Sequence, residues 1–138
     1  MTLAREDRQF VEGKLYKYKI YEQILNEYEA EYNAITEKLP GGIAKIPEGS
    51  ETSDNTFKNV SYIMLLDNKA KTARFYKRAI DDIYSLLNSE EKQIIRLKYW
   101  DRRLTDYGIY RELGMSERNF YYKLENILDK FAERMCIK

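Results

Sequence analysis

The stretch Thr105–Leu124, TDYGIYRELGMSERNFYYKL, predicts two helices joined by a tight turn. Thr105 is placed to cap a short helix from about Asp106 to Leu113, and Ser116 is placed to cap a second helix that continues to near the end of the chain. Between them, Gly114 supplies the left-handed backbone conformation that such a turn requires. Two helices joined in this way cross at a steep angle, which is the plan of a helix-turn-helix.

The helical period separates the second helix into an inner and an outer face. The apolar residues spaced to meet at the crossing are Ile109, Leu113, Met115 and Phe120. If Phe120, Leu124 and Ile127 point inward, the first two turns project polar and aromatic side chains outward. In a helix-turn-helix these turns enter the DNA major groove. We therefore expect DNA bases to be read by Glu117, Arg118, Asn119, Tyr121 and Tyr122, and which of the two tyrosines faces the groove is left open.

The residue types in this set suit base recognition. Arginine bonds a guanine edge through two parallel hydrogen bonds, asparagine does the same for adenine, and glutamate accepts from cytosine. Phosphate contacts that fix the register are expected from Arg102, Arg103, Arg111, Lys123 and Ser116, the last through the start of its helix. The alternative is a helical hairpin whose polar residues only face water, since an acidic residue such as Glu117 stabilises a helix start by itself.

Two long helices are predicted before this module. In residues 13–39 the apolar and aromatic residues recur in steps of three and four, at Tyr21, Leu25, Tyr28, Tyr32, Ile35 and Leu39. The helix could extend toward the N-terminus, with Gly13 as a weak point. Pro40 and two glycines must end it. After a Pro/Gly divider at residues 40–54, Ser53 or Asp54 is a plausible N-cap for a helix over about 55–87, and the two long helices are expected to pair within one chain or between chains.

The segment after the long helices carries a further start signal. Asn88 has Glu91 three residues on, which is the spacing of a capping box, and Ile94, Ile95, Leu97 and Tyr99 or Trp100 follow as core residues. The expected fold is all-α in two parts. Residues 1–87 form the long-helix pair, for oligomerisation or contact with RNA polymerase, and residues 88–138 form the DNA-binding module.

The composition disfavours several other classes of protein. There is no histidine and one cysteine, Cys136, so we expect no structural metal, cofactor or disulfide framework. The acidic doublets Asp81-Asp82 and Glu90-Glu91 are read as solvated or capping residues, because adjacent helix residues point apart, and an enzyme is disfavoured. The longest apolar run, residues 62–66, is too short to span a bilayer, so a cytoplasmic protein is expected. The net charge is +1, with a small acidic excess in the first half of the chain and a small basic excess in the second.

The C-terminal stretch, from LLNSEEKQIIRLKYW through LTDYGIYRELGMSERNFYYKLENILDKFA, resembles the promoter-reading fourth region of bacterial sigma factors. It is still more similar to phage and prophage late-gene transcriptional regulators of the ArpU/RinA group. The likeness is carried by the acidic start and the II-x-x-x-Y pattern of its first helix, by IYRELGMSER across the turn, and by the aromatic pair followed by ILDKFA. The resemblance implies a sequence-specific activator of late genes for packaging or lysis that binds double-stranded promoter DNA, with the recognition positions at Glu117, Arg118, Tyr121 and Tyr122.

Two other functions stay open from the sequence. A phage packaging or assembly adaptor, such as a small terminase subunit, also joins a helix-turn-helix to long oligomerising helices. In that family, however, the DNA-binding module usually precedes the long helices. A module that binds RNA polymerase and barely touches DNA would have the same helices. A module of this last kind would bind with little salt dependence, whereas phosphate contacts make affinity fall steeply with added salt.

Overall fold

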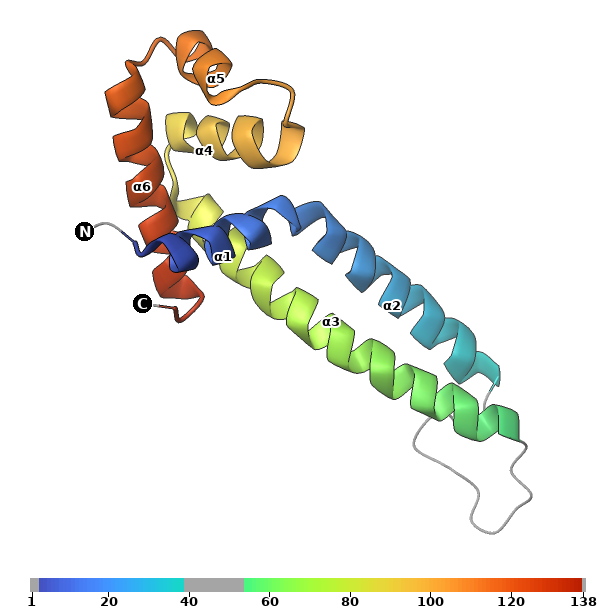
Figure 1. The fold of residues 1–138 in the computed structure, drawn as a ribbon. Coiled ribbons are helices and arrows are strands. Elements are labelled where there is room, and N and C mark those ends of the chain that lie inside the picture. The colour runs from blue at the N-terminus through green and yellow to red at the C-terminus, as the bar shows by residue number, and fades with distance from the viewer. Residues whose placement is uncertain (1–2, 39–53, 138) are drawn as a thin grey trace. The chain divides into compact units, whose positions relative to one another are not determined.

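The computed structural model describes residues 3–38 and 54–137, and every element in these ranges is a helix (Figure 1). The predicted all-α fold is therefore confirmed for this part of the chain. The described residues do not include Leu39 or residues 40–53 of the predicted Pro/Gly divider, so the capping candidate Ser53 also lies outside them. Asp54, the other capping candidate, is the first residue of the long helix that follows. The elements are α1 (Arg5–Tyr16), α2 (Tyr18–Lys38), α3 (Asp54–Leu86), α4 (Ser89–Ile95), the π-helical η1 (Arg96–Asp101), α5 (Asp106–Glu112) and α6 (Glu117–Arg134).

The chain divides into two compact units that differ from the predicted parts. Residues 1–19 and 76–138 form one, named here the α6 unit, and residues 20–75 form the other, named the hairpin unit. This division differs from the predicted boundary between residues 87 and 88, because α1 packs against α6 and η1. Val11 and Leu15 of α1 are fully buried by this packing. A helix from the start of the sequence thus belongs to the core of the C-terminal part.

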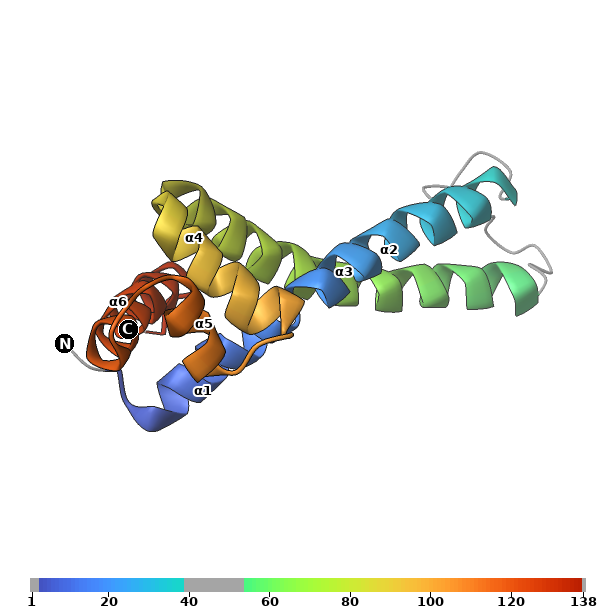
Figure 2. The same ribbon diagram turned by 90° about the horizontal axis from the view of Figure 1, so that it is seen from above.

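Helix α6 is the central element of its unit and contacts α1, α4 and α5 (Figures 1 and 2). Its apolar residues recur in steps of three and four, which places them on one face of the helix. These residues are all fully buried: Phe120, Leu124, Ile127, Leu128 and Phe131. The same face therefore fixes the rotation of the helix and determines which residues of its first turns are exposed.

Helix α1 is tied to η1 by two hydrogen bonds. The Tyr99 hydroxyl donates to Oε2 of Glu12 at 2.7 Å, and the Trp100 indole donates to the Leu15 carbonyl at 3.1 Å. Beyond α1 the chain bends at Lys17 and not at Gly13, which lies inside α1. The rings on both sides of Lys17 are held by η1, with Tyr16 4.9 Å from Tyr99 and Tyr18 stacked on Trp100 at 4.7 Å between centroids.

The hairpin unit consists of α2 alongside the N-terminal part of α3 (Figures 1 and 2). The two helices run antiparallel, because Tyr28 donates to Oδ1 of Asp67 at 3.2 Å while Ile35, further along α2, clusters with Ile63, which comes earlier in α3. The long helices thus pair within the chain. Tyr21 of the predicted stripe on α2 is buried, whereas Met64 on α3 is exposed.

None of the helices in residues 3–38 and 54–137 combines the length and the apolar composition needed to cross a membrane.

Candidate nucleic-acid interface

The turn before α6 is built as its sequence predicts. Gly108 donates its backbone N–H to the Thr105 hydroxyl at 3.2 Å, which caps α5, and Asn119 donates in the same way to Ser116 at 3.1 Å, which caps α6. Between the helices Gly114 has a φ of 68°, in the left-handed region that favours glycine. Helix α5 ends at Glu112, one residue earlier than predicted.

The helix crossing is closed by fewer residues than predicted. Ile109 and Phe120 are fully buried, whereas Leu113 and Met115 are only partly buried. The Tyr110 ring fills part of the crossing instead, with its centroid 5.7 Å from that of Phe120. This aromatic pair holds α5 against the start of α6.

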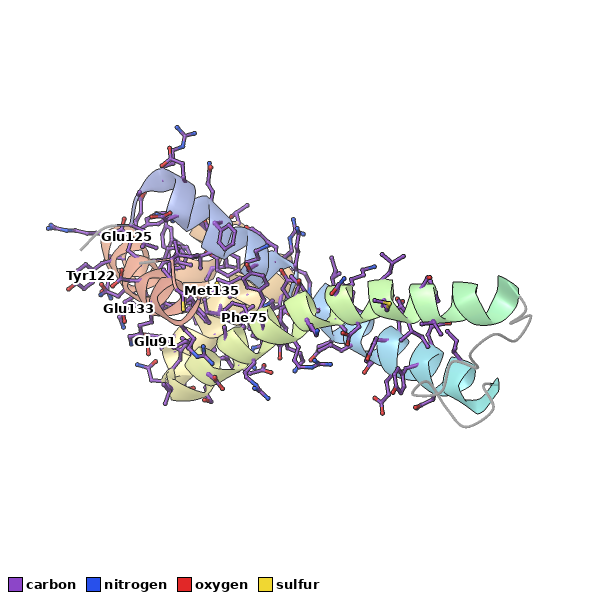
Figure 3. All side chains as sticks on the ribbon, turned by 90° about the horizontal axis from the view of Figure 1, so that it is seen from below. Phe75, Glu91, Tyr122, Glu125, Glu133 and Met135 are labelled. Carbon is purple, nitrogen blue, oxygen red and sulfur yellow. The ribbon has the colours of Figure 1, made fainter. Side chains whose placement is uncertain are left out.

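The first two turns of α6 present a polar face to solvent. Glu117, Arg118 and Asn119 are exposed, and Tyr122 is 65% exposed. An open hollow of about 470 Å³ lies along this face and is lined by Ser116, Arg118, Asn119, Tyr121, Tyr122 and Glu125. Figure 3 shows Tyr122 and Glu125 close together on α6. Glu125 was missed by the prediction, although it lies seven residues after Arg118 and so shares its helix face.

Tyr121 has a different environment from Tyr122. Its hydroxyl donates to Oδ2 of Asp106 at 3.1 Å, and Lys98 donates to the other carboxylate oxygen of Asp106 at 2.7 Å. Burial, and then the negative charge of Asp106, raise the pKa of Tyr121. Tyr121 therefore links α6 to the first residue of α5, while Tyr122 is the tyrosine that reaches solvent.

The arginines expected to bind phosphate are all exposed: Arg102, Arg103 and Arg111. Arg102 has a left-handed backbone with a φ of 55°, and its guanidinium lies 4.8 Å from the centroid of the Tyr16 ring. Arg111 lies over the Tyr107 ring at 5.5 Å. The aromatic rings restrict where both guanidinium groups point.

Lys123, also expected at phosphate, is half-buried and forms an ion pair with Glu90. This contact holds α6 to the start of α4, where Asn88 and Glu91 form the predicted capping box. Lys123 reaches a phosphate only by giving up Glu90. The ion pair joins residues 33 positions apart, so it left no local signal in the sequence.

The acidic doublets are engaged in helix contacts. Asp81 accepts from Tyr18 and, at 2.8 Å, from Lys77, while Asp82 pairs with Arg134 at 2.8 Å. Within the described residues, no three His, Cys, Asp or Glu side chains are grouped so that they could hold a metal ion.

These features define an all-α chain whose last long helix displays an exposed polar face at its capped start. The chain belongs to the family described as "Protein of unknown function (DUF722)", which matches residues 8–133. The match runs from α1 to the end of α6, so both units fall within the family. No curated protein and no solved structure matches the chain.

Proposed function

We propose that this protein is a sequence-specific DNA-binding transcriptional regulator, with α5 and α6 acting as a helix-turn-helix. The observation that carries the proposal is the division of α6, whose first two turns expose Glu117, Arg118 and Asn119 while Phe120, the next residue, is fully buried. A helix held rigidly by one face and exposing arginine and asparagine at its start has the chemistry needed to read base edges.

The environments of the side chains assign different roles to them. Arg118, Asn119 and Tyr122 line the open hollow and form the reading face, with Glu117 beside them. Tyr121 acts as a positioning residue, because its hydroxyl is bonded to Asp106. The exposed Arg102, Arg103 and Arg111 contact DNA phosphates and so fix the register of the protein on the duplex.

The regulated genes follow from the resemblance of the C-terminal stretch to late-gene regulators of the ArpU/RinA group. We infer promoter binding that activates late genes of a phage or prophage, in the cytoplasm and without a cofactor. A genome-wide binding map in the host tests this inference. Sites upstream of late genes are expected, whereas sites confined to a packaging start would favour the small terminase alternative.

The reading face is tested by the Arg118→Ala variant. A duplex is first selected from a random library by the wild-type chain, and its affinity is then measured for both proteins. Loss of a bidentate guanine contact is expected to cost about 1–3 kcal/mol, with relaxed preference at one base position. The matched control is Lys130→Ala, which changes an exposed cation on later turns of α6. Equal binding by the wild type and Arg118→Ala would refute the proposed reading face.

Phosphate contacts are tested separately with Arg102→Ala. This variant is expected to weaken binding to the selected duplex and to random duplex alike, and to reduce the salt dependence of affinity by about one counterion. A wild-type affinity for DNA that hardly changes with salt would favour the module that binds polymerase instead.

A further inference from the structure

The hairpin unit carries a second apolar stripe in addition to the one that joins its helices. On α3, Tyr62, Leu65, Leu66 and Lys69 follow the spacing i, i+3, i+4, i+7, which places them on one side of the helix. Tyr62 is 46% exposed and Leu65 is 68% exposed. Ile63, which faces α2, is by contrast buried. The contacts between α2 and α3 therefore leave this side of α3 uncovered.

Helix α2 has a matching stripe with acidic residues. Ile20, Ile24, Glu27 and Glu31 are spaced by three or four residues. Ile20, Glu27 and Glu31 are exposed, and Ile24 is half-buried. No lysine or arginine occurs in residues 20–35, whereas Lys69 ends the stripe on α3 with an exposed cation. The two stripes are thus apolar along part of their length and opposite in charge at their ends.

We propose that these stripes bind a second copy of this chain, so that two hairpin units form a four-helix bundle. Charge selects the arrangement. Placing α2 against α2 of the second copy would oppose Glu27 and Glu31 to each other, which is unfavourable. Placing α2 against α3 of the second copy brings these carboxylates near Lys69. A two-fold axis then forms the same contact twice, as an isologous interface requires.

The proposal is independent of DNA reading, because all of its residues lie in the hairpin unit. It is tested by the mass of the full-length protein in sedimentation equilibrium across micromolar concentrations. The wild type is expected to be a dimer. The double variant Tyr62→Gln, Leu65→Gln is expected to raise the dimer dissociation constant by roughly tenfold to a hundredfold, since it removes apolar surface from both copies of the interface.

The matched control is Met64→Gln, which removes an apolar side chain of α3 that is 63% exposed but points away from the stripe. It is expected to leave the dimer intact. Far-UV circular dichroism identifies variants that lose helix. A monomeric wild type, or a folded double variant that dimerises as well as the wild type, overturns the proposal.

Two charge variants test the arrangement of the helices. Glu27→Lys places two cations together at each contact, and Lys69→Glu places two carboxylates together, so each variant alone is expected to dimerise more weakly than the wild type. A mixture of the two restores opposite charges at both contacts and is expected to form a heterodimer. Failure of the mixture to dimerise better than either variant overturns the pairing of α2 with α3.

Discussion

The two units of this protein bury apolar side chains to different degrees. In the α6 unit, large residues such as Tyr99, Phe120 and Phe131 are fully buried. Among the hairpin-unit residues whose burial is described, Ala70 and Ala73 alone reach that level, and Ile63 keeps a relative exposure of 6%. The difference follows from the number of layers, since helices packed around α6 can enclose a side chain on all sides, whereas a helix pair covers it on one side only.

The same difference indicates which unit the proposed dimer would stabilise. The α6 unit has a core of its own that supports an exposed polar face on α6. The described part of the hairpin unit buries few large apolar side chains completely, and it exposes Tyr62, Met64 and Leu65. Its stability is therefore expected to rise when the apolar stripe is covered, while that of the α6 unit is expected to stay the same.

The largest expected effect on stability comes from replacing one buried isoleucine by alanine in each unit. Ile127→Ala in α6 empties a fully enclosed site and is expected to lower the free energy of unfolding by about 4 kcal/mol. Ile63→Ala in α3 is expected to cost about 2 kcal/mol, because the site is open on one side. Urea titrations followed by far-UV circular dichroism measure both values.

A second signal separates the units in these titrations. Trp100 is the sole tryptophan of the chain and lies in the α6 unit, so its fluorescence reports on that unit. Ile63→Ala should shift the circular dichroism curve to lower urea and leave the fluorescence curve in place. Equal costs for the two substitutions, or coincident shifts in both signals, would contradict the contrast between the units.

A smaller effect is expected from Tyr99→Phe in the α6 unit. The substitution removes the hydrogen bond to the Glu12 carboxylate and is expected to cost about 2 kcal/mol at neutral pH. Burial, together with this hydrogen bond, raises the pKa of Tyr99 above its ordinary value of 10.0. The folded state therefore holds this proton more tightly than the unfolded state does.

That pKa shift has a pH-dependent consequence. The stability that it contributes is fully present below pH 10 and is lost as pH rises above the ordinary tyrosine pKa toward the folded one. Tyr99→Phe should therefore lower stability at neutral pH and reduce its decline above pH 10. Thermal melts between neutral and alkaline pH measure both. A variant with an unchanged alkaline decline would show that Tyr99 does not cause it.

The helix starts were predictable from the sequence because their signals are local. Thr105, Ser116 and the Asn88–Glu91 capping box each act within three residues, and the structure confirms all of them. The fold class and the two long helices also follow from the helical period and from the prolines and glycines between them, whereas pairing within one chain was one of two alternatives that the sequence left open. Base reading and phosphate binding stay predictions, since only the exposure and contacts of those residues are established.

Other features had no local signal. The hydrogen bond from Tyr99 to Glu12 joins residues 87 positions apart, so no local pattern places α1 in the core of the α6 unit. Tyr121 and Tyr122 have the same side chain, and the hydrogen bond that distinguishes Tyr121 is accepted by Asp106, 15 positions away. The π-helical geometry of η1 and the left-handed backbone of Arg102 likewise have no signal in the residues beside them.

The smallest expected effect is that of Tyr28→Phe, which removes the corresponding tyrosine hydrogen bond in the hairpin unit. Tyr28 donates to Asp67, whose carboxylate also pairs with Lys71 at 3.1 Å, and that lysine and the Tyr28 hydrogen bond contribute to lowering the pKa of Asp67. Because the pair is open to water, solvent replaces the lost hydroxyl at little cost. The urea midpoint should therefore fall by less than it does for Tyr99→Phe. An equal or larger fall would contradict the weaker enclosure of side chains in the hairpin unit.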